Sequence, residues 1–308
     1  MEKSISIVIP VFNEEDILPF LFERLEKVCN NISNITEIIW IDDGSLDNSA
    51  NLIKELIGLS KNHKMVRFSR NFGHQAAVTA GLVEAKGDAV VVIDADLQDP
   101  PELIEQMIKM WKKGADVVYG VRRTRDGSVL LRLAYFIFYR LLNFFSEVKI
   151  PLDSGDFALM DRKVINSINA LPETLRFVRG IRAWVGFKQE ALGHDRPARY
   201  SGKSKYSFRA LYRLAVEGIA SFSLLPLKIS QLGAFCLGTL GIVFVIIVVI
   251  LKISSPSSIP DWMFLTIVTL FIGSFQLLCI YLLGAYIGRT FIEVKRRPPY
   301  IIMERIEK

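Results

Sequence analysis

The chain has 308 residues, of which 51% are hydrophobic and 23% are charged, and its formal net charge is +6 at pH 7. The basic residues form no single long run, which argues against a nucleic-acid-binding tail, and three widely spaced cysteines exclude a disulfide framework or a zinc site. Residues 1–225 have the composition of an ordinary globular domain, whereas residues 226–292 carry few charges.

Strand and helix patterns alternate along the first 122 residues. Short apolar runs rich in β-branched residues predict strands over 4–13, 37–45, 65–69, 88–96 and 115–122. Apolar residues at helical spacing predict helices over 14–29, 46–60, 73–86 and 101–114. This alternation with short connections predicts a Rossmann-like, mostly parallel sheet with helices on both faces.

Polar side chains follow the predicted strands, at the edge where such sheets bind ligands. Asp94 and Asp96 end the fourth strand in the sequence VVVIDADLQDPPE. Side chains two apart on an extended chain point the same way, so both carboxylates can face one cation. Oxygen ligands of this kind suit Mg²⁺ or Mn²⁺, and the metal would hold a diphosphate. The alternative is a turn with two capping acids.

Two long apolar segments follow the predicted domain. Residues 229–251 and 262–288 contain no charged residue, and each exceeds the roughly 20 helical residues that span a bilayer core. Lysine and arginine gather on the sides away from the short connecting loop, so the positive-inside rule predicts that both termini are cytoplasmic. Amphipathic patterns predict further helices over 123–150 and 207–225, the latter on the bilayer surface.

The predicted organisation therefore has four parts. They are a cytoplasmic domain over 1–206, an amphipathic juxtamembrane helix over 207–228, a transmembrane hairpin over 229–290 and a basic cytoplasmic tail over 291–308. Gly284 and Gly288, four residues apart in the second apolar segment, permit close helix packing and hence a homo-oligomer. His63 and His194 are expected at the surface, whereas His74 either packs at a helix start or contacts a ligand.

Several motifs, in the same order, resemble the family 2 glycosyltransferases, which have the GT-A fold. They are SIVIPVFNEEDIL, IIWIDDGSLDNS, RNFGHQAA and DADLQDPPE. The motifs SGDFALMDR (154–162), RGIRAWVGF (179–187) and RYSGKSKYS (199–207), with the two apolar segments, resemble the dolichol-phosphate mannose synthase and bactoprenol glucosyltransferase group. The resemblance covers essentially the whole chain. It implies an inverting, metal-dependent transfer of one hexose from a nucleotide-sugar to a polyprenyl phosphate at the plasma membrane.

The resemblance also implies roles on the donor side of the reaction. In the family, the N-terminal motif lines the nucleotide, the DDGS acid reads the base edge and the DADLQ motif holds metal and diphosphate. In this chain the nucleotide-binding residues are Pro10, Phe12, Glu14, Asp43 and Asp94, and the metal ligands are Asp94, Asp96 and Gln98.

On the acceptor side, Asp156 matches the family's usual candidate for a base. A phosphomonoester has a second pKa of about 6 and is largely anionic at neutral pH, so Asp156 either acts as a base or orients a basic group. Asp96 and Arg122 complete the predicted catalytic set. The predicted ligands of the acceptor phosphate are Arg122, Arg132, Arg199, Lys203 and Lys205.

Three alternatives remain open at this point. The bacterial glucosyltransferase branch is more similar in RGIRAWVGF and in its pair of spans, which favours UDP-glucose over GDP-mannose. Processive polysaccharide synthases carry Q-x-x-R-W and usually more spans, whereas here one residue separates Arg182 from Trp184 and no glutamine is in place. A non-enzymatic membrane scaffold is disfavoured because the acidic motifs are intact. Trp184 and Phe187 either line the sugar site or pack.

Overall fold

The structure, a computed structural model, describes residues 3–32, 34–60, 62–122, 154–174, 176–194 and 261–307, with isolated residues between 235 and 254. It contains two compact units, a first unit of Met1–Ala215 with Arg297–Lys308 and a second unit of Val216–Arg296. Some predictions fall outside the described residues. They are the amphipathic helices over 123–150 and 207–225, most of the apolar segment 229–251, and Arg132, Arg199, Lys203 and Lys205.

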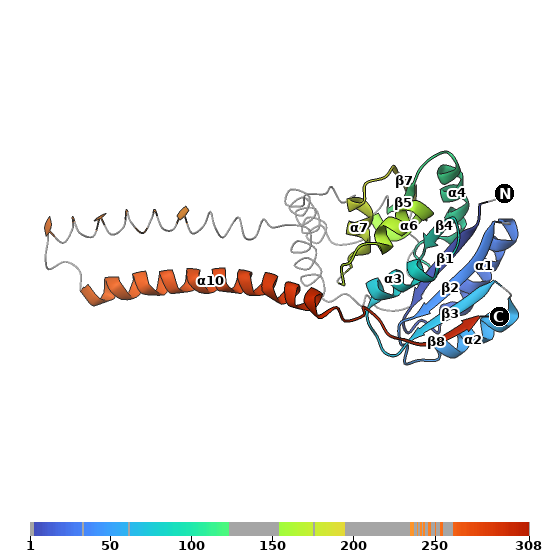
Figure 1. The fold of residues 1–308 in the computed structure, drawn as a ribbon, viewed down its shortest axis with the longest axis horizontal. Helices are drawn as coiled ribbons and strands as arrows, with labels where there is room; N and C mark the ends of the chain where they lie inside the picture. The colour runs from blue at the N-terminus through green and yellow to red at the C-terminus, as the bar shows by residue number, and fades with distance from the viewer. Residues whose placement is uncertain are drawn as a thin grey trace. The chain divides into compact units, whose positions relative to one another are not determined.

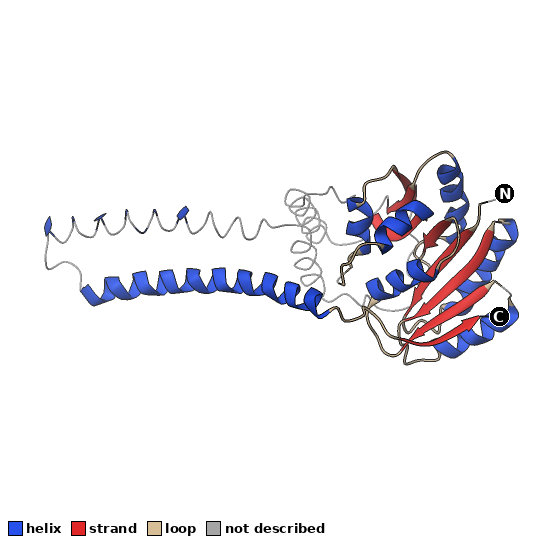
Figure 2. Ribbon diagram, viewed as in Figure 1, coloured by secondary structure: helices blue, strands red, loops and turns tan. Residues whose placement is uncertain are grey.

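The first unit is built on a mixed sheet with the strand order β7-β5-β6-β4-β1-β2-β3-β8 among the described residues (Figure 2). The strands are β1 Ile5–Val11, β2 Ile35–Asp42, β3 His63–Phe68, β4 Ala89–Val92, β5 Val117–Arg122, β6 Ser154–Asp161, β7 Gln189–His194 and β8 Ile302–Glu307. Strands β4, β1, β2 and β3 run parallel to one another, and β5 runs parallel to β7. Strand β6 is antiparallel to β4 and β5, and β8 is antiparallel to β3. The expected mostly parallel sheet is confirmed.

Helices cover both faces of this sheet (Figure 1). One face carries α1 Leu18–Asn31, α2 Ser49–Leu59 and α4 Ile104–Lys112, the last preceded by the 3₁₀ turn η1 Pro101–Leu103. The other face carries α3 His74–Glu84, α6 Arg162–Asn169 and α7 Val178–Trp184, which contact one another. Every helix predicted over the first 122 residues is present, with its bounds shifted by a few residues.

The central strand β1 is buried along its whole length, and its two faces pack against different helices. Ile7 and Ile9 belong to the same apolar core as Leu21 of α1. Val8 faces α3, and it lies so close to Gly81 that a Cβ added there would overlap its side chain. Full burial of each such aliphatic side chain stabilises the fold by roughly 1.5–3 kcal/mol. This packing fixes β1 in the sheet centre, where its carboxyl end leads directly into residues 12–14.

Strand β4 is shorter than the sequence predicts, which changes the argument for the two acids after it. It ends at Val92, so Asp94 follows the strand and Asp96 lies in a turn. Leu97 in this turn has φ 56°, in the left-handed region that a branched side chain rarely adopts. The expectation that Asp94 and Asp96 share one face of an extended strand is therefore wrong, and their placement comes from the turn.

The second unit contains the long helix α10, Asp261–Lys295. Its segment Phe271–Lys295 is, among the described residues, the one helix long and apolar enough to cross a membrane, judged by length and composition. Gly284 and Gly288 lie in this segment, and their role in an oligomer stays a prediction.

Residues after α10 return to the first unit. Residues 291–308 are predicted to form a tail, whereas Ile302–Glu307 forms β8, paired with β3 from Lys64 opposite Glu307 to Phe68 opposite Ile302. Two ion pairs, Arg305 with Glu84 and Lys54 with Glu304, tie this strand to neighbouring helices.

Candidate active site

Most of the predicted donor-side residues lie at one edge of the sheet. Strands β4, β1 and β2 are neighbours and parallel, so the segments that follow them start side by side. These segments contain Asp94 and Asp96 after β4, residues 12–14 after β1, and Asp43 directly after β2. Pro10 lies within β1, and Arg122 is the last residue of β5, which runs in the same direction as β4.

Hydrogen bonds join the segments that follow β1 and β2. The Asn13 N–H donates to Ser45 Oγ at 3.0 Å, and the Leu46 N–H donates to Asn13 Oδ1 at 2.8 Å. The Glu14 N–H donates to Ser49 Oγ at 2.9 Å. Asn13 has φ 53°, a conformation that asparagine tolerates better than most residues. The predicted nucleotide-binding segment is thus held in one conformation against its neighbour.

The carboxylate of Asp43 is buried and already has three hydrogen-bond donors. It accepts from Asn71 Nδ2 at 3.0 Å, from the Phe72 N–H at 2.7 Å and from the Gly73 N–H at 2.9 Å. Burial raises the pKa of Asp43, while the two backbone donors oppose the rise. Asp43 therefore anchors the turn that leads into α3. Its role in reading the base edge stays a prediction.

Asp94 has the environment of a cation ligand. Its Oδ1 is buried and has no hydrogen-bond partner among the described residues. Burial raises the pKa of Asp94 to about 6, and the nearby carboxylates of Asp156 and Asp96 add to the rise although His74 opposes it. A divalent cation would relieve this unfavourable negative charge. Asp94 therefore fits a metal site.

The described residues contain no group of three His, Cys, Asp or Glu side chains that could hold a metal by themselves. Mg²⁺ typically binds to one or two carboxylates and completes its octahedron with substrate phosphates and water. Asp96, whose Oδ1 accepts from the Gln98 N–H at 3.1 Å, is the second acid of this turn. Two acids and an incoming diphosphate match that mode of binding, and the role of Gln98 as a ligand stays a prediction.

His74 links the metal-site acid to Asp156. Val92 of β4 pairs with Ala158 of β6, and continuing this antiparallel register places position 94 opposite position 156. His74, the first residue of α3, has its Nε2 3.2 Å from Asp156 Oδ2 and 3.6 Å from Asp94 Oδ1. Burial lowers the pKa of His74, but Asp94 and Asp156 outweigh burial and raise it to about 9. At neutral pH the ring is therefore an imidazolium between two carboxylates.

Asp156 has further donors from α3 and α7. Gln75 Nε2 donates to Asp156 Oδ2 at 3.2 Å, and Arg179 Nε donates to Oδ1 at 3.4 Å. Gln75 also accepts from the Val178 N–H at 2.8 Å, which fixes α7 against α3. Burial raises the pKa of Asp156, but Arg179 and His74 outweigh it and hold the pKa far below its usual range. A carboxylate of this kind is a weak base.

Arg182, one turn after Arg179 on α7, is only 2% exposed. Its Cζ lies 5.3 Å from the centre of the Tyr119 ring, a cation–π contact. No described residue accepts a hydrogen bond from its Nε or Nη2. Burial lowers the pKa of Arg182 to about 10, and the positive charge of Arg179 adds to the effect. The guanidinium nevertheless remains charged at neutral pH.

Sequence reasoning missed three members of this cluster. Gln75 and Arg179 were part of quoted motifs without a role, and Arg182 entered only through the comparison with Q-x-x-R-W. For His74 the sequence left open packing at a helix start or contact with a ligand. The structure places its ring beside Asp94 and Asp156, and contact with a ligand stays a prediction. A signal was present, because His74 and Gln75 follow a polar loop at a helix start.

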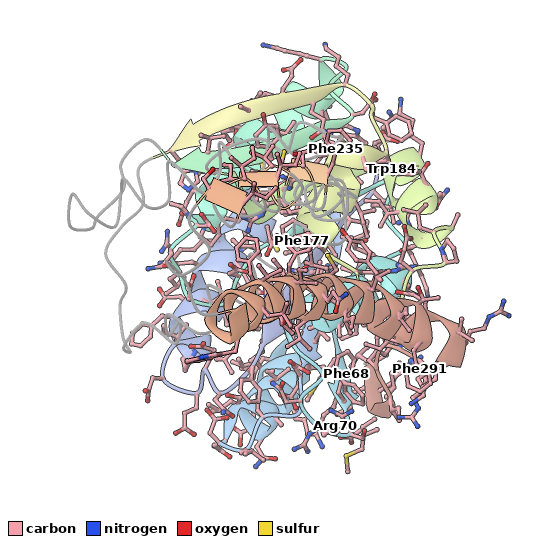
Figure 3. All side chains as sticks on the ribbon, turned by 90° about the vertical axis from the view of Figure 1, so that its left-hand side faces the viewer. Phe68, Arg70, Phe177, Trp184, Phe235 and Phe291 are labelled. Atoms are coloured by element: carbon pink, nitrogen blue, oxygen red, sulfur yellow. The ribbon has the colours of Figure 1, made fainter. Side chains whose placement is uncertain are left out.

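Two histidine predictions are wrong, because His63 and His194 are buried. His63 Nδ1 accepts from Trp40 Nε1 at 3.0 Å, and His194 Nε2 lies 2.9 Å from Asp99 Oδ1. Each ring thus has a buried partner from a distant part of the sequence, and the other ring nitrogen of His194, Nδ1, has no hydrogen-bond partner among the described residues. Trp184, in contrast, is 56% exposed at the end of α7 (Figure 3), and it is not part of the core.

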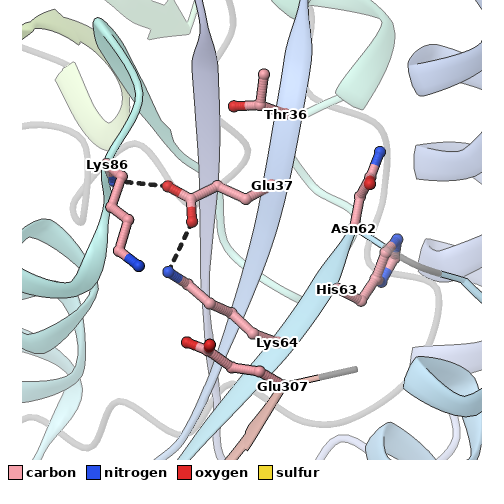
Figure 4. A pocket seen from close by; sticks show the side chains of 7 residues that line it. All are labelled: Thr36, Glu37, Asn62, His63, Lys64, Lys86 and Glu307. Carbon is pink, nitrogen blue, oxygen red and sulfur yellow. Dashed lines mark hydrogen bonds and ion pairs between the residues drawn. The ribbon is translucent and has the colours of Figure 1, made fainter.

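A shallow pocket lies at the opposite edge of the sheet, around the amino ends of β2 and β3 (Figure 4). It is lined by Thr36, Glu37, Asn62, His63, Lys64, Lys86 and Glu307. Glu37 and Lys64 form an ion pair of 2.6 Å in its wall. Because none of the predicted site residues lines it, this pocket is separate from the candidate active site.

Comparison with known proteins identifies the family. The model of "Glycosyl transferase family 2" matches residues 6–168, from β1 to the last turn of α6. The chain belongs to this family. As a family 2 glycosyltransferase it is an enzyme, and its sheet with helices on both faces is the GT-A fold that the motifs implied.

Full-length relatives narrow the group within the family. The glycosyltransferase YkcC of Bacillus subtilis is 42% identical over 300 residues, covering 97% of this chain and 93% of that protein. The bactoprenol glucosyl transferase of Shigella phage SfV is 38% identical over 307 residues, covering 99% of both chains. These matches confirm the resemblance to the polyprenyl-phosphate glycosyltransferase group.

A solved structure supports the fold. The glucosyl-3-phosphoglycerate synthase of Mycobacterium tuberculosis, crystallised with Mn²⁺, uridine diphosphate and phosphoglyceric acid, aligns with a TM-score of 0.51. The alignment covers 71% of this chain and 76% of that one at 19% sequence identity, so it shows a common fold.

Proposed function

We propose that this family 2 glycosyltransferase transfers one glucose, with inversion, from UDP-glucose to a polyprenyl phosphate of the undecaprenyl type. The observation that carries the proposal is the match over 99% of both chains to a bactoprenol glucosyl transferase. The fold likeness to a synthase crystallised with Mn²⁺ and uridine diphosphate supports a uridine nucleotide and a divalent metal. A GDP-mannose-using synthase is the alternative donor assignment.

The site geometry suits this chemistry. Asp94 and Asp96 would hold Mg²⁺ or Mn²⁺, which when bound neutralises charge on the diphosphate leaving group. The Asn13 and Ser45 contacts keep the nucleotide segment in place, so the donor meets a preorganised edge. A phosphate oxygen of the lipid attacks the anomeric carbon, and the bond from that carbon to the uridine diphosphate breaks with its electron pair. The nucleophile is already anionic, so the step releases no proton.

The topology of the first unit supports a membrane hairpin. The first unit includes both residues 1–215 and residues 297–308, and β8 pairs with β3 in one sheet. A sheet lies on one side of a membrane, so the chain between these parts crosses it an even number of times. If Phe271–Lys295 makes one crossing, a second crossing lies within residues 216–260, where the charge-free segment 229–251 is found. The lysine and arginine distribution supports a cytoplasmic position for the first unit.

The deciding assay is single-sugar transfer by the purified full chain in lipid nanodiscs. UDP-glucose and GDP-mannose, each labelled in the sugar, are offered with undecaprenyl phosphate and Mg²⁺ or Mn²⁺. We expect one labelled glucose per lipid from UDP-glucose, and a loss of at least 100-fold on chelation or in Asp96→Asn. The matched control is Asp88→Asn, an acid just before β4, at the strand's other end, which should retain the parent rate.

Other outcomes reject specific parts of the proposal. Mannose transfer rejects the donor assignment, and a product with several sugars per lipid indicates a processive synthase. Full activity in chelator rejects the metal requirement.

A second experiment tests the proposed membrane topology. A membrane-impermeant thiol reagent should label Ser257→Cys, in the loop between the apolar segments, only from the non-cytoplasmic side.

A further inference from the structure

Basic side chains surround Asp156. The Nε2 of His74 lies 3.2 Å from one carboxylate oxygen, and Arg179 donates to the other at 3.4 Å. The charge of Arg182 also acts on Asp156 from the same helix as Arg179. Arg179 and Arg182 therefore bring two guanidinium groups to this side of the cluster, and His74 lies between Asp156 and Asp94.

The burial of Arg182 is the strongest sign that an anion is bound here. An ionised side chain removed from water without a partner costs several kcal/mol, which a structure avoids unless something compensates. The contact with the Tyr119 ring supplies part of the compensation. Two of the guanidinium nitrogens still have no acceptor among the described residues. Guanidinium groups match phosphate oxygens in a two-pronged geometry, so a phosphate group is the fitting ligand.

We propose that Arg179 and Arg182 form the binding site for the phosphate group of the acceptor lipid, and that Asp156 is a positioning residue that orients Arg179 and His74. The proposal rests on the proposed function and specifies its acceptor side. It replaces the role of a base for Asp156 with an electrostatic one.

The order of the charged groups separates the acceptor phosphate from the donor diphosphate. The contacts run from Asp94 through His74 and Asp156 to Arg179. The donor diphosphate belongs at the Asp94 end with the metal, which leaves the arginine end for the second phosphorylated reactant. His74 and Asp156 lie between the metal site and the arginines. They therefore separate the binding groups of the donor diphosphate from those of the acceptor phosphate.

Asp156 has no proton to remove in this step. The bond that forms joins a phosphate oxygen to the anomeric carbon, and the bond that breaks sends its electrons to the uridine diphosphate. Because the nucleophilic oxygen is already anionic, a base adds little. A carboxylate that holds Arg179 and His74 in place supplies instead a preorganised electrostatic environment.

The first test measures KM for each substrate separately in Arg179→Gln and Arg182→Lys. We expect KM for undecaprenyl phosphate to rise at least tenfold, while KM for UDP-glucose and the calorimetric affinity for uridine diphosphate with Mn²⁺ stay within twofold. The control is Arg305→Gln, whose arginine pairs with Glu84 at 2.9 Å at the other end of α3. That end is about 15 Å from His74 at 1.5 Å per residue, so the control should keep both KM values.

The possible outcomes distinguish an acceptor role of the two arginines from a donor role. Weaker binding of uridine diphosphate shows that the arginines serve the donor and overturns the proposal, as do unchanged KM values for both substrates. If Arg182→Lys does not fold, Arg179→Gln alone decides, because its side chain is partly exposed and its loss leaves no cavity in the core. A parent enzyme that transfers to no polyprenyl phosphate rejects the proposed function itself, which the parent reveals before any variant is compared.

The second test is Asp156→Asn, which keeps the shape of the side chain but removes its charge. A positioning role predicts a raised KM for the lipid, a kcat within about tenfold of the parent at saturating lipid, and an unchanged shape of the pH profile of kcat. A general base contributes typically 10²- to 10⁴-fold and shows as a lost limb of that profile. A fall of this size with a changed profile overturns the positioning role.

Discussion

Replacing Glu37 by glutamine tests how strongly a buried ion pair stabilises the sheet. Glu37 lies on β2, where its carboxylate accepts from Lys64 Nζ at 2.6 Å, from the Lys86 N–H at 2.6 Å and from Ser6 Oγ at 2.5 Å. The side chains of Glu37 and Lys64 are only 14% and 9% exposed. In Glu37→Gln the ammonium of Lys64 keeps the carbonyl of Glu84 at 3.0 Å as an acceptor and loses its counter-charge.

The expected loss follows from this burial. Removing one partner of a fully buried pair costs about 3–5 kcal/mol. Here glutamine can still accept hydrogen bonds and the pair borders a shallow pocket, so we expect a loss of about 2–3 kcal/mol at pH 7. For a unit of this size that corresponds to a fall in Tm of roughly 4–12 °C.

The pH dependence gives a second readout. Burial raises the pKa of Glu37, but the bonds from Lys64 and Ser6 outweigh it and the net pKa is lowered. A lowered pKa means that the pair stabilises the fold above the unfolded value of about 4.3, and that this contribution is lost as pH falls through the folded value. The difference between parent and variant should therefore shrink in acid.

Thermal unfolding of the full chain in detergent, followed by near-ultraviolet circular dichroism, measures the effect. The control Glu105→Gln removes an exposed pair with Lys109, which should change stability by less than about 0.5 kcal/mol. Adding Lys64→Met to Glu37→Gln should restore much of the loss, because no unpaired charge is left. A Glu37→Gln variant as stable as the control would refute the reasoning.

Three further changes test the fold of the first unit. Gly44→Ala places a Cβ against the backbone of Arg70 at φ 68°, so we expect a loss of about 1–3 kcal/mol in unfolding free energy and a higher KM for the donor. Trp40→Phe removes the donor to His63 and should cost about 1–2 kcal/mol by chemical denaturation. Burial lowers the pKa of His63, so parent stability should fall as pH drops below about 6.5, and a flat profile between pH 7 and 5 would contradict this. Deleting residues 302–308 should lower Tm and promote aggregation in light scattering, because the edge of β3 becomes unpaired.

The sequence predicts the first 122 residues well because their signals are local. The apolar run that ends at Val11 and the helical spacing of Leu18, Leu21 and Leu25 each lie within a few residues, and the structure buries these side chains as expected. The acids at the carboxyl edge follow from the same alternation. Family membership then confirms the fold to which these elements belong.

What the sequence could not predict depends on pairing between distant segments. The run IMERIE follows a basic, proline-containing stretch and looks like a tail until β3 is known to need a partner strand. The cluster around Asp156 joins residues 74, 156 and 179, which come together only because β6 runs antiparallel beside β4. Likewise, the burial of His194 depends on Asp99, from another part of the chain, whose carboxylate forms a hydrogen bond with His194 Nε2.

The pairing of β8 with β3 has a consequence for synthesis of the protein. Strand β8 follows α10 in the sequence, so it is synthesised after both apolar segments. Until then, the edge of β3 that pairs with β8 has no partner strand. If the apolar segments form the proposed membrane hairpin, an odd number of crossings would leave β8 on the wrong side of the membrane and the sheet incomplete. In the proposed membrane hairpin, correct insertion is in this way a condition for completing the sheet, and misinserted copies keep an unpaired strand edge at β3.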